Sequence, residues 1–184
     1  MSVGRKRADE LVRQAPLARR EGRTNDAHRD LSEAVSLYRS ESANGELIQA
    51  LRALSEVERD LGRDDEAMKL YEEGVAVSRD VGDPLLLAHT IRHLGQLHHD
   101  AGRVKDAERC YLEALDLYRN HDDTPPLDVA NAVRPLAILS EEAGDTEAAR
   151  RLWEEARDLY EECGIDAGVD ECTERLTGLN SDRP

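Results

Sequence analysis

Four glycines mark a repeat that runs through most of the chain. Gly22, Gly62, Gly102 and Gly144 are spaced 40, 40 and 42 residues apart, and similar residues recur at fixed distances on both sides of each glycine. A fixed period of roughly 20 to 50 residues indicates an architecture in which each unit packs on its neighbours. The period therefore predicts a repeat protein.

The segment after each glycine has small and large residues at helical spacing. The fifth position after the glycine holds Ala27, Ala67, Ala107 and Ala149, and the ninth holds Leu31, Tyr71, Tyr111 and Trp153. The twelfth position holds Ala34, Gly74, Ala114 and Ala156, and the sixteenth holds Tyr38, Ser78, Tyr118 and Tyr160. These columns hold all six aromatic residues of a chain without phenylalanine. We expect a core of aliphatic stripes with the few rings in these columns.

The segment before each glycine carries an apolar stripe. The stripe occupies the positions eleven, eight, five and one residues before the glycine. These positions hold Leu51, Leu54, Val57 and Leu61 in the second copy, Ile91, Leu94, Leu97 and Ala101 in the third, and Val133, Leu136, Leu139 and Ala143 in the fourth. The first copy has Leu11, Gln14, Leu17 and Glu21 there. Spacings of three and four place such residues on one helix face. Each repeat is thus predicted to be two antiparallel helices, an A helix and a B helix, with the glycine in a left-handed conformation after the A helix.

The predicted helices after the first repeat cover residues 45–61, 64–81, 84–101, 104–119, 126–143 and 146–163, with a ninth, capping helix at 166–179. Asp83-Pro84 and Thr124-Pro125 are typical of an N-cap followed by a first-turn proline. Pro135 predicts a kink near residues 131–135, or alternatively a helix that begins at Pro135.

These patterns predict one all-α domain over residues 1–179. Its repeats would cover about 5–40, 45–82, 84–121 and 126–164, and residues 180–184 would form a frayed tail. The expected fold is a right-handed α-α superhelix of about four helical hairpins, followed by the capping helix.

The repeat resembles the tetratricopeptide repeat (TPR). The residues that carry the resemblance are Leu54-Ser55, Leu94-Gly95 and Leu136-Ala137 in the A helices, with Ala67, Tyr71 and Gly74 and their equivalents in the B helices. Units of 40 to 42 residues are similar to those of kinesin light chains and of bacterial regulators. The resemblance implies a non-catalytic protein whose A helices line a concave groove that binds peptides or partner proteins.

The same resemblance implies which positions face that groove. Ten residues before the glycines stand Arg52, Arg92 and Arg134, and neighbouring groove-facing positions hold Gln49, His89, Asn131, Gln96, Arg59 and His99. Arginine forks beside amides suit a carboxylate or an acidic peptide. Alternatively, these arginines are solvated or paired with acids such as Glu56. The carboxylate clamp of chaperone-binding repeats is not reproduced.

Composition and motifs exclude several classes of function. With 40 acidic and 25 basic residues the net charge is −15, which disfavours binding to nucleic acid. No stretch approaches the ~20 apolar residues of a membrane span, and the charged start is unlike a signal peptide, so we expect a soluble cytoplasmic protein without a membrane partner. The chain has no glycine-rich phosphate loop and no signature of a nucleophile beside a base. We expect no enzymatic activity and no cofactor.

Histidines and cysteines leave two further hypotheses. His89 and His93 have metal-ligand spacing, but zinc needs three or four ligands, so surface or core histidines are the favoured interpretation over a metal site. Cys163 and Cys172 flank the turn before the capping helix and are interpreted either as two buried thiols or as a regulatory disulfide.

The sequence therefore predicts a binding module for a peptide or partner protein. Two alternatives remain open: a regulatory array that changes curvature when it binds a signalling peptide, and a scaffold that self-associates through exposed end faces into a homo-oligomer.

Overall fold

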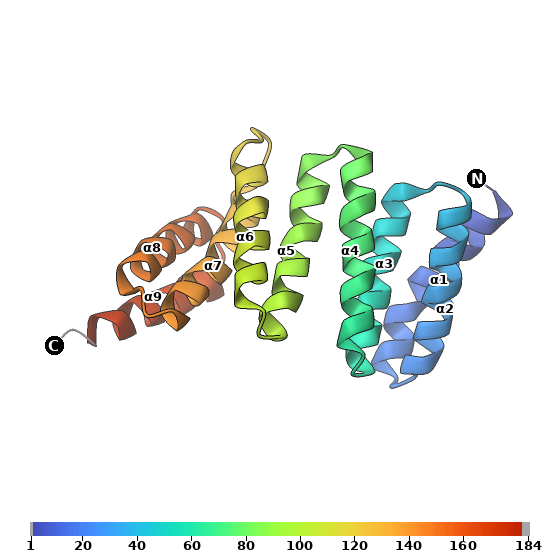
Figure 1. Ribbon diagram of the computed structural model, residues 1–184, viewed down its shortest axis with the longest axis horizontal. Helices are drawn as coiled ribbons and strands as arrows, with labels where there is room; N and C mark the ends of the chain where they lie inside the picture. Colours follow the sequence, from blue (N-terminus) through green and yellow to red (C-terminus); the bar gives the residue numbers. More distant parts are fainter. Residues whose placement is uncertain (1, 182–184) are drawn as a thin grey trace. The chain divides into compact units, whose positions relative to one another are not determined.

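The computed structural model describes residues 2–181, and the fold there is all-α, as predicted (Figure 1). The described part contains nine helices: α1 (Val3–Arg20), α2 (Thr24–Ser40), α3 (Asn44–Asp60), α4 (Asp64–Val81), α5 (Pro84–Asp100), α6 (Val104–Arg119), α7 (Pro126–Glu142), α8 (Thr146–Glu162) and α9 (Asp166–Ser181). The predicted ranges from residue 45 onward agree with these bounds to within two residues at every end.

Four antiparallel hairpins follow one another along the chain. Helices α1 and α2, α3 and α4, α5 and α6, and α7 and α8 form the closest packed pairs, and α9 packs on α8. The chain divides into two compact units, one with α1–α4 that ends at Asp83 and one with α5–α9 that begins at Pro84. The predicted arrangement of A and B helices is therefore confirmed within each unit.

The marker glycines end the A helices as predicted. Gly62, with a φ of 71°, donates its N–H to the carbonyl of Arg59, and the next residue, Arg63, donates to the carbonyl of Glu58, both at 2.9 Å. This pair of bonds satisfies carbonyls in the last turn of α3, and it requires the left-handed conformation that Gly62 adopts. All four marker glycines have φ values of 71–76°.

Among residues 2–181, one residue other than glycine also takes a left-handed conformation. Ser42, in the turn after α2, has a φ of 51°. A left-handed conformation costs an L-residue roughly 1–2 kcal/mol.

We predict that Ser42→Gly raises the free energy of unfolding of the first unit by about 0.5–1 kcal/mol, because the relieved strain exceeds the extra entropy of glycine in the unfolded chain. Urea unfolding would measure the change. Ser36→Gly, at an exposed serine inside α2, is the matched control and is expected to destabilise. A loss of stability in both variants would contradict the prediction.

The predicted columns form the core. All six aromatic side chains are buried, and the alanines five residues after the glycines have no exposed surface. In the A helices, the predicted stripe is buried at its first three positions in α3, α5 and α7. The fourth position was predicted wrongly: Ala101 and Ala143 are exposed and Leu61 is half-buried, because each lies at or beyond its helix end.

The first A helix departs from the stripe at one residue. Leu11 is 2% exposed, whereas Leu17 is 55% exposed. The equivalents of Leu17 in the other A helices, Val57, Leu97 and Leu139, are all buried. The sequence thus places Leu17 on the apolar stripe, but this face of α1 has no helix against it in the described first unit.

Prolines set the beginning of two A helices. Helix α5 begins at Pro84, directly after Asp83, as expected. In α7 the prediction was off by one residue: the N-cap is Pro125 with a ψ of 136°, and Thr124 lies before it. A residue before proline is pushed into the extended region, so the second proline, Pro126, becomes the first helical residue.

Helix α7 runs through Pro135, which is buried, so the alternative of a helix that begins there is wrong. The kink near residues 131–135 stays a prediction.

Helix α9 extends to Ser181, two residues beyond the predicted end, and residues 182–184 of the predicted tail lie outside the described residues. Within residues 2–181, no helix is both long enough and apolar enough to span a bilayer.

Candidate functional site

The arginine at the first predicted groove position is partly neutralised. Arg52 lies in α3, and its Nη1 is 3.6 Å from an oxygen of Glu56, one turn on. The other carboxylate oxygen of Glu56 accepts a hydrogen bond from Arg19 of α1 at 2.7 Å. Arg52 therefore shares one carboxylate with a second arginine, as the ion-pair interpretation expected. Gln49 and Arg59 lie on the same helix and are exposed.

The third arginine is fully paired. Arg134 of α7 donates from Nε and Nη2 to the two carboxylate oxygens of Glu171 in α9, at 2.7 and 2.6 Å. This bidentate pair is a strong form of charge-assisted hydrogen bond. Sequence reasoning missed it because it treated α9 only as a cap; the acid at position 171 was the available signal.

The pair also shifts both pKa values. Hydrogen bonding to Arg134 lowers the pKa of Glu171 below its ordinary value, and the reciprocal bond raises the pKa of Arg134. Because the folded-state pKa of Glu171 is lowered, the pair stabilises the fold above the pKa of an unfolded glutamate and this contribution disappears as the pH falls through the folded-state value.

We predict that Arg134→Gln raises the pKa of Glu171, because the variant removes the charge and the bidentate bonds that favour the carboxylate. A carbon-detected NMR titration of the Glu171 carboxyl group measures this shift in the folded protein. The variant Arg109→Gln removes an exposed arginine of α6 and serves as the control. An unchanged Glu171 titration in Arg134→Gln would contradict the bidentate contact.

The middle arginine is different. Arg92 of α5 pairs with no carboxylate in the described part of the chain; its Nη2 lies 3.2 Å from Nε2 of His93. Its Nε atom is buried and has no hydrogen-bond partner in the structure. Of the three arginines at this position, Arg92 is therefore the one whose charge is not balanced by an acid.

The charge of Arg92 acts on three buried tyrosines of the second unit. Burial raises the pKa values of Tyr111, Tyr118 and Tyr160, and the positive charge of Arg92 opposes this rise in all three. The opposing effect shows that Arg92 is close enough to act electrostatically on phenols of both hairpins of the second unit. These tyrosines are buried, and charges interact more strongly in a poorly solvated interior than in water.

The other predicted site residues of α5 are the polar side chains His89, Gln96 and His99. The His89 ring makes an edge-on contact with the His93 ring, with centroids 4.6 Å apart. Gln96 accepts a hydrogen bond from the Tyr111 hydroxyl at 3.4 Å and donates to Asp100 at 2.7 Å. One turn on, Nε2 of His99 lies 3.1 Å from Glu142 of α7.

Asn131 has a partner within its own hairpin. The Tyr160 hydroxyl donates to its side-chain oxygen at 3.0 Å, and Tyr38 makes the equivalent bond to Asp9 at 2.7 Å. The two residues of each pair are 29 positions apart in the sequence, and this shared spacing is the signal from which the Asn131–Tyr160 bond could be predicted. This bond links α7 to α8 and leaves the side-chain NH2 of Asn131 to donate to a ligand.

The structure groups the predicted site residues in two places. Arg52, Gln49 and Arg59 belong to the first unit, and the other six belong to the second, on α5 and α7. The part centred on Arg92 is the candidate site, because there a cation lacks a carboxylate while its neighbours offer amides and imidazoles.

Neither metal nor thiol chemistry is supported at this site. Among the described residues, no three histidines, cysteines or acids converge to hold a metal ion. All three cysteines are thiols; Cys110 and Cys172 are buried and Cys163 is half-buried. Burial raises the pKa of Cys172 to about 11, which keeps it protonated and unreactive at neutral pH.

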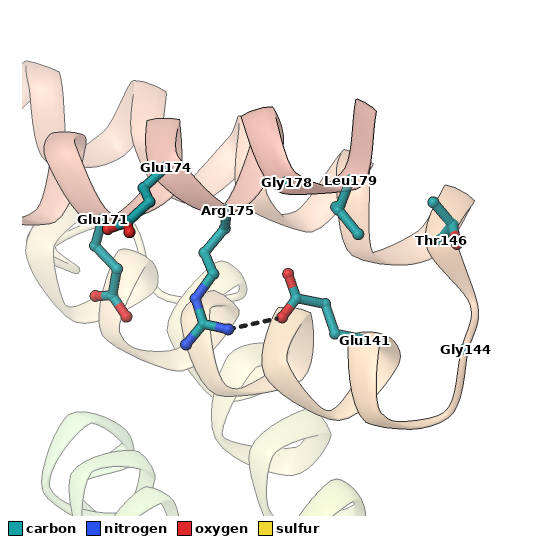
Figure 2. Close-up of a pocket in the computed structure, with 8 residues that line it drawn as sticks. All are labelled: Glu141, Gly144, Thr146, Glu171, Glu174, Arg175, Gly178 and Leu179. Carbon is teal, nitrogen blue, oxygen red and sulfur yellow. Dashed lines mark hydrogen bonds and ion pairs between the residues drawn. The ribbon is translucent and has the colours of Figure 1, made fainter. Parts of the chain in front are cut away.

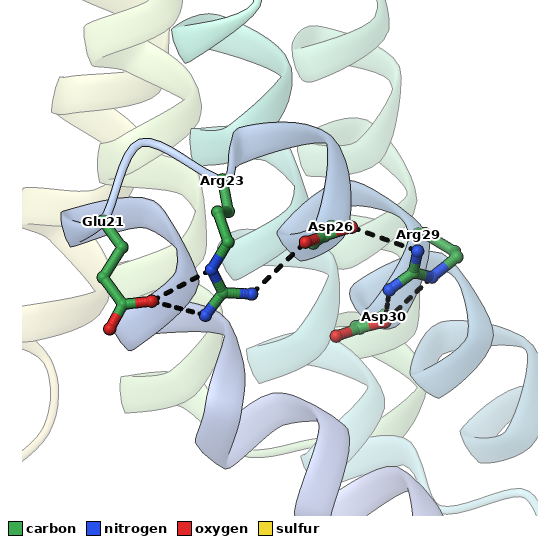
Figure 3. A network of polar contacts seen from close by, with 5 residues as sticks. All are labelled: Glu21, Arg23, Asp26, Arg29 and Asp30. Carbon is green, nitrogen blue, oxygen red and sulfur yellow. Dashed lines mark hydrogen bonds and ion pairs between the residues drawn. The ribbon is translucent and has the colours of Figure 1, made fainter.

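A second cluster of arginines, at the turn between α1 and α2, is already balanced (Figure 3). Arg23 bonds to Glu21 and Asp26, and Arg29 bonds to Asp26 and Asp30, at 2.6–3.2 Å. These side chains are largely exposed, so the pairs contribute little stability. They leave no unbalanced cation for an acidic ligand.

An open cleft of about 780 Å³ lies between the α7–α8 turn and α9 (Figure 2). Glu141 lies on its wall, where it accepts hydrogen bonds from Nε1 of Trp153 at 2.8 Å and from Arg175 at 3.1 Å. Glu171 and Glu174 also line it. The cleft is therefore acidic, its one arginine is paired, and it contains none of the predicted ligand residues.

Comparison with known proteins identifies the repeat. A family model described as tetratricopeptide repeat matches residues 46–120. No curated protein matches the chain. Similar solved structures include aspartyl phosphate phosphatase F from Bacillus subtilis, with a TM-score of 0.82 and 14% identity, where 94% of this chain matches 45% of the phosphatase.

Two more structures share the fold. A Rap protein complexed with competence and sporulation factor has a TM-score of 0.79 and 15% identity, over 94% of this chain and 47% of that one. A protein from Podosopora anserina described as a kinesin light chain with nearly identical TPR-like repeats has a TM-score of 0.60 and 15% identity over the full length of both chains. This chain thus spans about half the length of the phosphatase and of the Rap protein complexed with competence and sporulation factor.

Proposed function

We propose that this chain, which is a tetratricopeptide repeat protein, is a non-catalytic module that binds an acidic or carboxylate-bearing segment of a peptide or partner protein at Arg92. Such repeats are interaction modules, and the observation that carries the finer proposal is the unbalanced guanidinium of Arg92. A carboxylate from a ligand would supply the missing counter-charge. A bacterial, cytoplasmic setting belongs to the same proposal and rests on the resemblance to bacterial repeat regulators.

The chemistry of the site favours a carboxylate over other ligands. An arginine fork matches the two oxygens of a carboxylate, and a hydrogen bond to a charged group contributes about 1.5–3 kcal/mol. Gln96 is exposed beside Arg92 and can contact the backbone of a ligand. Arg134 is held by Glu171, so in this proposal it positions α9 rather than the ligand.

The experiment is a selection from a library of displayed peptides, followed by affinity measurement with the wild-type chain and with Arg92→Gln. We expect the selected peptides to be enriched in acidic residues or free C-terminal carboxylates, and Arg92→Gln to weaken them about tenfold to hundredfold. Arg109→Gln changes an arginine that is 73% exposed and paired with Asp106, and it should leave affinity unchanged. Equal affinities of wild type and Arg92→Gln would remove Arg92 from the site.

A second candidate is a regulatory array that responds to a signalling molecule. It is favoured by the similarity to a Rap protein that was solved with competence and sporulation factor. In this case a ligand selected as above would change the radius of gyration of the chain in X-ray scattering. An unchanged scattering profile at saturating ligand would favour the passive module.

A further inference from the structure

A separate apolar groove lies in the second unit, between α6 and the α7–α8 hairpin. It encloses about 340 Å³, and the lining residues that matter below are the aliphatic Val104, Leu112 and Leu139 and the charged Glu108, Arg119 and Asp145. None of the residues assigned above to the ligand site lines it. The lining is mostly aliphatic, which is typical of a surface that accepts a side chain from another helix.

The groove presents exposed apolar groups with an acidic rim. Val104 is 44% exposed and Leu112 is 51% exposed, so two large aliphatic side chains of α6 face solvent. Of the charged lining residues, Arg119 is paired with Glu155. Glu108 has no ion-pair partner among the described residues, and Asp145 is exposed and caps α8. The rim is therefore net negative.

Helix α1 carries the complementary surface. A stripe at spacings of three and four residues follows its solvent side and consists of Val3, Lys6, Glu10, Arg13, Leu17 and Arg20. Glu10 and Arg13 pair with each other at 2.6 Å. Lys6 and Arg20 have no ion-pair partner within residues 2–181, so the stripe is net positive around the exposed Leu17.

The repeat itself shows what Leu17 is suited to contact. Leu17 and Leu139 occupy the same position, five residues before the marker glycine of their A helix. Leu139 is 6% exposed and lines the groove together with Leu112 of the B helix α6. A leucine at this position of an A helix therefore packs beside α6 in this structure, whereas Leu17 is exposed.

We propose that the α6–α7 groove binds helix α1 of a second copy of this chain. Leu17 enters the groove beside Leu112 and Leu139, and Arg20, one turn away, faces the carboxylate of Glu108. The two surfaces differ, so the contact is heterologous. In an assembly, the copy at one end keeps an unused groove and the copy at the other end keeps an unused α1. One helix in one groove is a small interface, so the association is weak and depends on concentration.

Analytical ultracentrifugation of the full chain tests this contact up to about 0.5 mM, where a Kd in the upper micromolar range is detectable. The weight-average mass of the wild-type chain should rise with concentration and pass that of a dimer. Leu17→Glu and Leu112→Glu change exposed residues on the two surfaces, and each should weaken association at least about tenfold. Val81→Glu, at a valine that is 41% exposed elsewhere, is the matched control and should associate like the wild type.

Mixing the two variants gives the sharpest result. Leu17→Glu retains an intact groove and Leu112→Glu retains an intact α1, so an equimolar mixture should form a dimer and nothing larger, although each variant alone is monomeric. Circular dichroism of both variants confirms that they are folded. A wild-type chain that stays monomeric over the whole range, a dimer that survives Leu112→Glu, or a mixture that stays monomeric would overturn the proposal. None of these outcomes bears on Arg92, which lies outside this contact.

Discussion

Replacing Trp153 with alanine is expected to lower the free energy of unfolding of the second unit by about 3–5 kcal/mol. Trp153 is the largest residue of the chain without exposed surface, and it fills the space between α7 and α8. Its Nε1 donates to Glu141 at 2.8 Å, and Arg175 lies 5.8 Å from its ring centroid. Alanine removes the ring and leaves a cavity in the hairpin that also supports α9.

Urea unfolding measured by far-UV circular dichroism is suitable, because the only tryptophan is removed. The control Trp153→Phe keeps most of the apolar contact but loses the hydrogen bond to Glu141. It should cost about 1–2 kcal/mol for the lost bond plus a small packing loss, which is less than the cost of the alanine variant. A loss below about 1 kcal/mol in Trp153→Ala would show that the α7–α8 hairpin is not held by this ring.

The second large effect is expected for Gly95→Ala. A Cβ at this position would lie 2.8 and 2.9 Å from two ring atoms of Tyr111 and 3.0 Å from the Cβ of Cys110. Tyr111 is 1% exposed and cannot move aside without disturbing the core. Overpacking of this kind costs about 1–3 kcal/mol, and the variant should be destabilised by that amount.

Gly45→Ala is the matched control for Gly95→Ala. Both glycines are helical, but a Cβ at Gly45 meets nothing within 4 Å, so alanine there should stabilise by up to about 1 kcal/mol through helix propensity. The double variant Gly95→Ala/Tyr111→Leu should show a favourable coupling energy in a double-mutant cycle, because the smaller side chain relieves the clash. Stabilisation by Gly95→Ala alone would show that α5 and α6 are not in close contact there.

Most of the fold was predictable because the repeat reports the same physical requirement several times. Positive φ after each A helix requires glycine, and a close approach of A and B helices requires alanine, glycine or serine at fixed positions. Four copies of such a pattern fix the helix ends closely. Leu17 was not predictable in the same way, because the stripe shows that a residue is apolar but not whether a neighbouring helix covers it.

The site was less predictable than the fold. The sequence places Arg52, Arg92 and Arg134 at one position, but their different states depend on acids elsewhere in the chain. Arg134 is bound by Glu171 from α9, and Arg52 shares Glu56 with Arg19. Arg92 is distinguished only by the lack of such an acid, which becomes visible when side chains of different helices are placed together.

The most direct test of the binding proposal is an NMR titration of the arginine Nε–H groups with a selected acidic peptide. The proposal predicts that the Arg92 Nε–H resonance shifts and saturates with the measured affinity, while the Arg109 resonance stays in place. Arg134 should respond weakly, because Glu171 already holds its guanidinium. A peptide that binds with full affinity and leaves the Arg92 resonance unchanged would contradict the proposal.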